Sequence, residues 1–125
     1  MHRLGIWIDH KEAFIVFADT MELHRTRSGI EKHVRYSGEG AGHGNTAEDA
    51  HDRQFAVHLE RYYDEVIAKA HDAESIFIFG PGEAKGELRK RIEAKGLGKK
   101  VVGFETVDKM TEHQIAAKVQ QHYAR

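Results

Sequence analysis

The sequence predicts an α/β fold of three layers, in which helices cover a mixed five-stranded sheet. Near the start of the chain, two apolar runs rich in β-branched and aromatic residues are separated by only three polar residues. Further along, short apolar runs alternate with stretches in which apolar residues have helical spacing. Glycine and proline end these segments abruptly, most clearly where Ile76-Phe77-Ile78-Phe79 meets Gly80-Pro81-Gly82.

The first third of the chain predicts antiparallel strands. Residues 4–9 and 13–18 are expected to form a hairpin around His10-Lys11-Glu12. Residues 20–27 add an edge strand, which residues 30–36 extend. The nine residues from Gly38 to Thr46 contain four glycines and no large apolar side chain, which predicts an exposed, mobile loop.

The rest of the chain predicts three helices and two strands. Thr46 is the expected cap of a long helix that ends near His71. Residues 75–79 and 100–105 are predicted strands, joined by a helix over 83–95 that Gly96 ends. Thr111 begins a last helix, with Gln114 at the capping-box position. With right-handed crossovers, this succession predicts the strand order 3-2-1-4-5 and an arrangement of the ribonuclease-H-like type.

Composition restricts the classes of function. The 125 residues predict one domain over residues 1–125, and a net charge of -1 gives no overall electrostatic bias toward nucleic acids or membranes. No apolar run approaches the ~20 residues that a membrane-spanning helix needs. The first residues, Met1 to Trp7, lack the core of a signal peptide, and the chain has no cysteine. A cytoplasmic protein without disulfides or thiolate zinc sites is expected.

Motifs spread over nearly the whole chain resemble a known family. The most specific is Ile78-Phe79-Gly80-Pro81-Gly82-Glu83-Ala84-Lys85. The others, in chain order, are Ile8-Asp9-His10-Lys11-Glu12-Ala13, Ser28-Gly29, the segment Gly38–Thr46, Val102-Gly103 and Thr106-Val107-Asp108. Together they resemble the middle domain of archaeal and eukaryotic peptide-chain release factors and of their relative Pelota. The resemblance implies a role in translation, with the glycine-rich segment as an exposed tip.

At this tip the chain departs from release factors, which carry Gly-Gly-Gln and use it to hydrolyse peptidyl-tRNA. Here the tip reads Gly42-His43-Gly44-Asn45, and asparagine carries its amide on an arm one methylene shorter. A displacement of about 1 Å can lower a rate about a hundredfold. From Gly38 to Glu65, seven acidic residues also oppose two basic ones, which disfavours insertion into RNA. Pelota lacks Gly-Gly-Gln and is the nearer functional analogue, so no catalytic residue is assigned; an enzyme would use Asn45 and His43.

Positive charge gathers in the second half of the chain. The segment Lys85–Lys100 contains seven basic and two acidic residues. A basic helix edge beside Gly80-Pro81-Gly82 is a candidate contact for an RNA backbone, and an ordinary solvated helix face is the alternative. The predicted RNA-binding residues are Lys85, Arg89 and Lys90 on this helix, with Gly42, His43, Gly44 and Asn45 at the tip.

Other chemistries fit the residues less well. A two-metal nuclease needs several converging carboxylates, but Asp9 has no counterpart at Gly80-Pro81-Gly82 and is expected to be a turn residue. His51 and His58 lie two helical turns apart, too far to share an ion unless His43 reaches in, so no metal site is assigned. No phosphate-binding Gly-x-x-x-x-Gly-Lys-Ser/Thr pattern is present, so no cofactor is expected.

The resulting hypothesis is a translation-associated protein that binds the ribosome or structured RNA and has no catalysis of its own. A second protein is the candidate source of the release-factor domains that this chain does not supply. Membranes and DNA are not expected partners. Two alternatives stay open: a peptidyl-tRNA hydrolase-like release or rescue enzyme that uses the tip, and a protein-interaction module that has kept only the fold.

Overall fold

A computed structural model describes residues 2–29 and 45–124, with the backbone alone for residues 45–54. The strands are β1 (His2–Ile8), β2 (Glu12–Phe17), β3 (Glu22–Arg27), β4 (Ala73–Gly80) and β5 (Val101–Thr106). The helices are α2 (Asn45–Lys69), α3 (Ala84–Ala94) and α4 (Glu112–Tyr123), and a 3-10 helix, η1 (Gly98–Lys100), precedes β5. The predicted extension of the edge strand over residues 30–36 lies outside the described residues.

The five strands form one mixed sheet in the order β3-β2-β1-β4-β5. The β1–β2 and β2–β3 pairs are antiparallel, whereas β1–β4 and β4–β5 are parallel. In each parallel pair the later strand, β4 or β5, directly follows a helix, because the chain must cross back over the sheet before it can form a parallel strand. The predicted fold class and strand order are confirmed.

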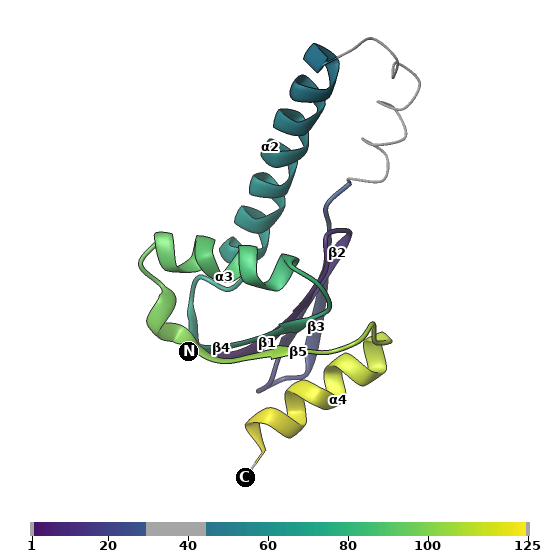
Figure 1. The fold of residues 1–125 in the computed structure, drawn as a ribbon. Helices are drawn as coiled ribbons and strands as arrows, with labels where there is room; N and C mark the ends of the chain where they lie inside the picture. Colours follow the sequence, from purple (N-terminus) through teal and green to yellow (C-terminus); the bar gives the residue numbers. More distant parts are fainter. Residues whose placement is uncertain (1, 30–44, 125) are drawn as a thin grey trace.

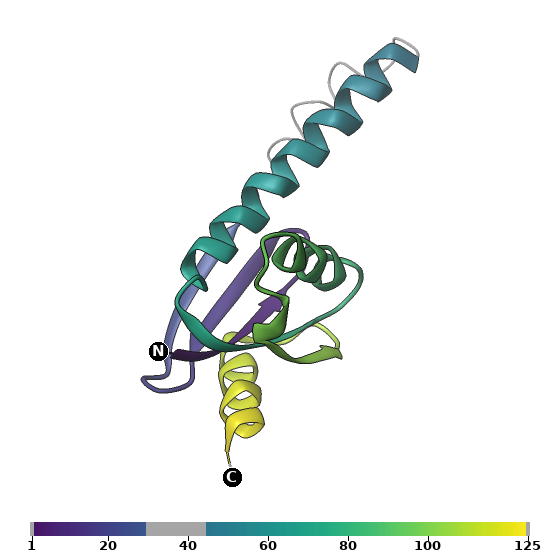
Figure 2. The same cartoon turned by 90° about the vertical axis from the view of Figure 1, so that its left-hand side faces the viewer.

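Helices cover both faces of this sheet, so the fold has three layers (Figures 1 and 2). Helices α2 and α3 lie on one face, where Ile6, Ile78 and Leu88 belong to one buried cluster. Helix α4 covers the opposite face, where Trp7, Phe79 and Ile115 are buried together. The central strands β1 and β4 supply side chains to both clusters, which is why their sequences read as continuous apolar runs.

Helix α4 packs very close to β1. A side chain on Gly5 would place its Cβ 2.4 Å from Cγ2 of Val119, so only glycine allows this approach. The hydroxyl of Tyr123 donates to the carbonyl of Leu4 at 2.8 Å. The predicted capping box at the start of α4 is confirmed, since Thr111 Oγ1 accepts from the Gln114 amide at 3.2 Å and Gln114 Oε1 accepts from the Thr111 amide at 3.0 Å.

Helix α2 is longer than the sheet it covers, and its N-terminal part extends beyond the sheet (Figure 2). Its 25 residues correspond to about 37 Å of helix. Along its length, Tyr62 and Val66 are buried, while Phe55 and Leu59 are only partly covered. The predicted cap at Thr46 is wrong, because Asn45 already belongs to the helix.

Within the described residues, no helix combines the length and apolar character needed to cross a membrane.

Candidate functional site

The turn after β1 is the first part of the candidate site. It lies at the carboxyl ends of the parallel strands, where open α/β sheets commonly bind ligands. Asp9 Oδ1 accepts hydrogen bonds from the backbone amides of Lys11 and Glu12, both at 2.8 Å. The Asp9 amide donates to the Glu12 carbonyl at 3.0 Å. The prediction that Asp9 is a turn residue is confirmed, and its partners are backbone amides.

Gly80 brings the end of β4 against β1 beside this turn. Its φ is +154°, and a Cβ at this position would lie 2.2 Å from the carbonyl oxygen of Ile8. Any other residue would clash with the backbone of the neighbouring strand. The strand exit therefore leads directly into Pro81 and Gly82, whose carbonyl accepts a hydrogen bond from the Lys85 ammonium.

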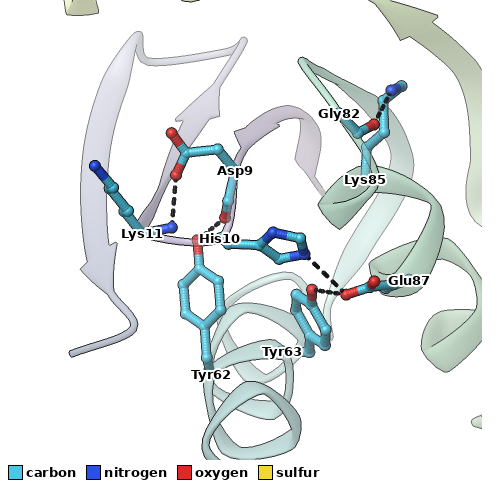
Figure 3. Close-up of polar contacts among 8 residues, drawn as sticks. All are labelled: Asp9, His10, Lys11, Tyr62, Tyr63, Gly82, Lys85 and Glu87. Carbon is cyan, nitrogen blue, oxygen red and sulfur yellow. Dashed lines mark hydrogen bonds and ion pairs between the residues drawn. The ribbon is translucent and has the colours of Figure 1, made fainter. Parts of the chain in front are cut away.

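A polar cluster from three elements covers the turn after β1 (Figure 3). His10 from the turn and Tyr63 from α2 both contact Glu87 Oε1 from α3, with His10 Nε2 at 3.1 Å and the Tyr63 hydroxyl donating at 2.5 Å. Beside them, the Tyr62 hydroxyl donates to the Asp9 carbonyl at 2.8 Å. The turn is therefore held by two consecutive tyrosines of α2 and one glutamate of α3.

The two tyrosines act as hydrogen-bond donors at neutral pH. Burial raises the pKa of Tyr62 well above its usual range, and the negative charge of Asp9 adds to the shift. Burial also raises the pKa of Tyr63, and its hydrogen bond to Glu87 raises it further. Both phenols stay protonated, so their role in the cluster is to hold the turn and not to accept a proton.

A groove of about 470 Å³ runs between α2 and α3 next to this cluster. The wall formed by α2 is partly apolar, and the wall formed by α3 carries both acidic and basic side chains. The lining residues are Ala56, Leu59, Glu60, Tyr63, Glu87, Lys90, Arg91 and Ala94. Arg91 is held by Asp64, whose carboxylate accepts from Nε at 2.7 Å and from Nη2 at 2.9 Å. Lys90 is exposed and forms no ion pair among the described residues.

The predicted basic surface of α3 is divided by its contacts. Lys85 is 6% exposed, because its ammonium points back to the Gly82 carbonyl. Arg91 and Lys95 both contact Asp64, and Lys100 donates to the His71 carbonyl at 3.1 Å. In the described part of the chain, Arg89, Lys90 and Lys99 are the cations of this segment that are exposed and form neither a hydrogen bond nor an ion pair.

Sequence reasoning missed Phe104, which belongs to the same surface. The guanidinium carbon of Arg89 lies 4.4 Å from the centroid of the Phe104 ring, and Lys85 Nζ lies 5.8 Å from it. The sequence contains one signal of this arrangement, because Lys85 and Arg89 are four residues apart and share a helix face. That this face meets Phe104 depends on the register between β4 and β5.

The predicted tip lies mostly outside the described residues. Gly42, His43 and Gly44 are not described, and the hydrolase alternative depends on them. Asn45 is the first described residue of α2, so the structure places it in a helix and not in a loop. Among the residues with described side chains, no group of three His, Asp or Glu side chains is placed to hold a metal ion.

No protein family and no curated protein matches this sequence. Among solved structures, the chain is similar to the archaeal translation termination factor aRF1, at 13% identity and a TM-score of 0.54 over 95% of this chain and 36% of that one. The Thermoplasma acidophilum Pelota protein is similar at 18% identity and a TM-score of 0.48, over 89% of this chain and 29% of that one. The chain thus spans about a third of the length of these proteins. The predicted release-factor-like fold is confirmed, while its assignment to the middle domain stays a prediction.

Proposed function

We propose that this chain is a translation-associated protein that binds the ribosome or structured RNA without catalysis of its own. The fold it shares with aRF1, a translation termination factor, over 95% of its length is the main support. We also propose that the chain acts as a single release-factor-like module. A second protein that carries further release-factor domains is a proposed partner.

The proposed phosphate contacts are Arg89 and Lys90 on α3. Both side chains are exposed, and neither forms an ion pair with a described carboxylate. Lys85 has a different part in this proposal, since its ammonium is already hydrogen-bonded to Gly82 and is buried. It fixes the turn before α3 and thereby the position of Arg89, one helical turn further on. The tip residues Gly42 to Asn45 stay a predicted second contact.

The proposal assigns no reaction to the chain. Asp9, the carboxylate at the end of β1, is used by the backbone amides of its own turn. His10 and Tyr63 are both hydrogen-bonded to Glu87, and the tyrosine is kept protonated. These groups stabilise the turn after β1, at the end of the sheet from which α3 begins.

Ribosome co-sedimentation over a range of salt concentrations tests the proposal. The double variant Arg89→Ala/Lys90→Ala is expected to bind at least about tenfold more weakly at low salt. The slope of the logarithm of the binding constant against the logarithm of the salt concentration should fall by about 1.4 to 1.8, because each lost phosphate contact contributes about 0.7 on a single strand and about 0.9 on a duplex. Lys109→Ala removes one exposed charge from the segment before α4 and serves as the control. Equal binding by the wild type and the double variant, or an equal loss with Lys109→Ala, would contradict the proposal.

A further inference from the structure

Phe104 lies on the edge strand β5 and is 39% exposed, which is unusual for a large aromatic residue beside a packed helix. The pairing of β4 with β5 explains its position. Ile76 pairs with Val101 and Phe77 with Gly103, so Val102 is an extra residue that shifts the register. After this bulge, Phe104 pairs with Ile78, which belongs to the cluster under α2 and α3. Phe104 therefore lies on the α3 side of the sheet and not on the α4 side.

Two cations of α3 lie against this ring. Arg89 is 4.4 Å from the ring centroid and Lys85 is 5.8 Å from it. Both distances are within the range of cation–π attraction. In the described part of the chain neither cation forms an ion pair with a carboxylate, since the Lys85 ammonium donates to a carbonyl and Arg89 has only the ring. An exposed ring with uncompensated positive charge beside it suits a ligand that is both planar and anionic.

We propose that Phe104 and Arg89 together bind one unpaired base of RNA by stacking, while Arg89 and Lys90 contact the adjacent phosphates. The inference rests on the proposed RNA-binding function and specifies the form of RNA that this surface takes. Bases of single strands and loops stack on aromatic rings and on guanidinium planes, whereas bases within a duplex are not accessible. Stacking tolerates any base, because every base has a π-face.

Val102, on the same strand, serves to distinguish base stacking on Phe104 from a general apolar contact with β5. Val102 is 54% exposed, more than Phe104, but its side chain has no aromatic ring on which a base could stack. An apolar protein partner would use both side chains of this strand. A stacked base would use the ring of Phe104 and depend little on Val102.

A tryptophan at position 104 makes the stacking visible. The only tryptophan of the chain, Trp7, is 0% exposed and lies on the α4 side of the sheet. In Phe104→Trp, a stacked base should quench the new fluorescence, while that of Trp7 stays unchanged. The titration uses a 12-nucleotide single-stranded RNA and a duplex of the same sequence. We expect quenching with the single strand and none with the duplex.

Affinity measurements with matched variants complete the test. Phe104→Ala and Phe104→Leu should weaken single-strand binding by about tenfold or more, the range found when one stacking ring is removed. Phe104→Trp should retain wild-type affinity within about twofold, and Val102→Ala should do the same. The salt slope of Phe104→Ala should equal that of the wild type, because no phosphate contact is lost. Thermal unfolding of each variant shows whether it is folded.

The outcomes distinguish the two proposals. If the wild type binds neither ribosomes nor RNA, the proposed function and this inference both fail. If the wild type binds RNA and Arg89→Ala/Lys90→Ala lowers the salt slope, but Phe104→Leu binds normally, the stacking inference alone is overturned. It is also overturned if Val102→Ala weakens binding as much as Phe104→Leu, or if the duplex quenches Phe104→Trp equally.

Discussion

At the scale of single residues, Gly80 has the most constrained position near the candidate site. Its φ of +154° favours glycine, and a Cβ there would lie 2.2 Å from the Ile8 carbonyl oxygen. Neither β1 nor β4 can move away easily, because both are buried on two faces. The glycine is thus required by the contact between the two central strands and not only by the turn that follows.

Two alanine substitutions test this explanation with opposite expected signs. Gly80→Ala should lower the free energy of unfolding by about 3 kcal/mol or more, because the methyl group overpacks a rigid contact. Gly86→Ala, inside α3 and with no atom within 4 Å of the added Cβ, should raise it by about 1 kcal/mol through helix propensity. Urea denaturation measures both. If Gly80→Ala left the free energy of unfolding unchanged, β1 and β4 would have to separate without cost, which would contradict this explanation.

Also at this scale, the hydroxyls of Tyr62 and Tyr63 show how position gives neighbouring residues different partners. Tyr62 donates to the backbone of the turn after β1, and Tyr63 donates to a side chain of α3. Successive residues of a helix point about 100° apart, so one pair of tyrosines reaches two elements. This pair links α2 both to the turn after β1 and to α3.

At the scale of elements, α2 and α3 are joined by the ion pairs of Asp64 with Arg91 and Lys95, called here the Asp64 clasp. Asp64 of α2 accepts two hydrogen bonds from Arg91, and Lys95 Nζ lies 3.4 Å from its Oδ1. Hydrogen bonding from Arg91 lowers the pKa of Asp64 below its ordinary value of 3.8. The clasp lies beside the groove and determines which basic residues of α3 stay available.

Asp64→Asn is expected to lower the free energy of unfolding at pH 7 by less than about 1 kcal/mol, because the pair is partly exposed and screened. A lowered folded pKa means that the stabilisation is present above pH 3.8 and is lost as the pH falls through the folded pKa. The difference between variant and wild type should therefore shrink below about pH 4.

Urea denaturation between pH 7 and pH 3 measures this difference. Asp108→Asn, at an exposed position without a described ion pair, is the control and should match the wild type throughout. If the difference in the free energy of unfolding between Asp64→Asn and the wild type grew on acidification, it would contradict a stabilising role of the Asp64 ion pairs.

At the scale of the whole molecule, the sheet connects two separate buried clusters. Helices α2 and α3 cover one, and α4 covers the other. Strands β1 and β4 place alternate side chains in each, so loss of either cluster removes support from the same strands. We expect the described layers to unfold as one cooperative unit.

Leu88→Ala on the α3 face and Ile115→Ala on the α4 face test this cooperativity. Both side chains are fully buried, and each substitution should cost about 2 to 5 kcal/mol. Trp7, which lies on the α4 side, reports the transition by fluorescence. Leu88→Ala should shift the Trp7 transition although it acts on the far face. A Trp7 transition that stays in place would show that the two layers unfold separately.

Much of the architecture follows from local patterns in the sequence. The apolar runs that became β1, β2 and β4, the stop at Gly80-Pro81-Gly82 and the capping box at Thr111 depend on chain geometry and on contacts a few residues apart. The strand order followed because crossover connections between parallel strands have one preferred hand. Boundaries shifted by one or two residues, as expected where elements fray, and α2 begins before the cap predicted at Thr46.

The amino-acid sequence by itself determined which segments are strands and helices and that positive charge gathers on α3. Only the tertiary structure decided that Arg91 and Lys100 are engaged, because their partners Asp64 and His71 lie 27 and 29 residues earlier in the chain. The same holds for Phe104, whose side of the sheet is set by a one-residue bulge against β4. Periodicity along a chain carries no information on such contacts, since they depend on how separate elements meet in space.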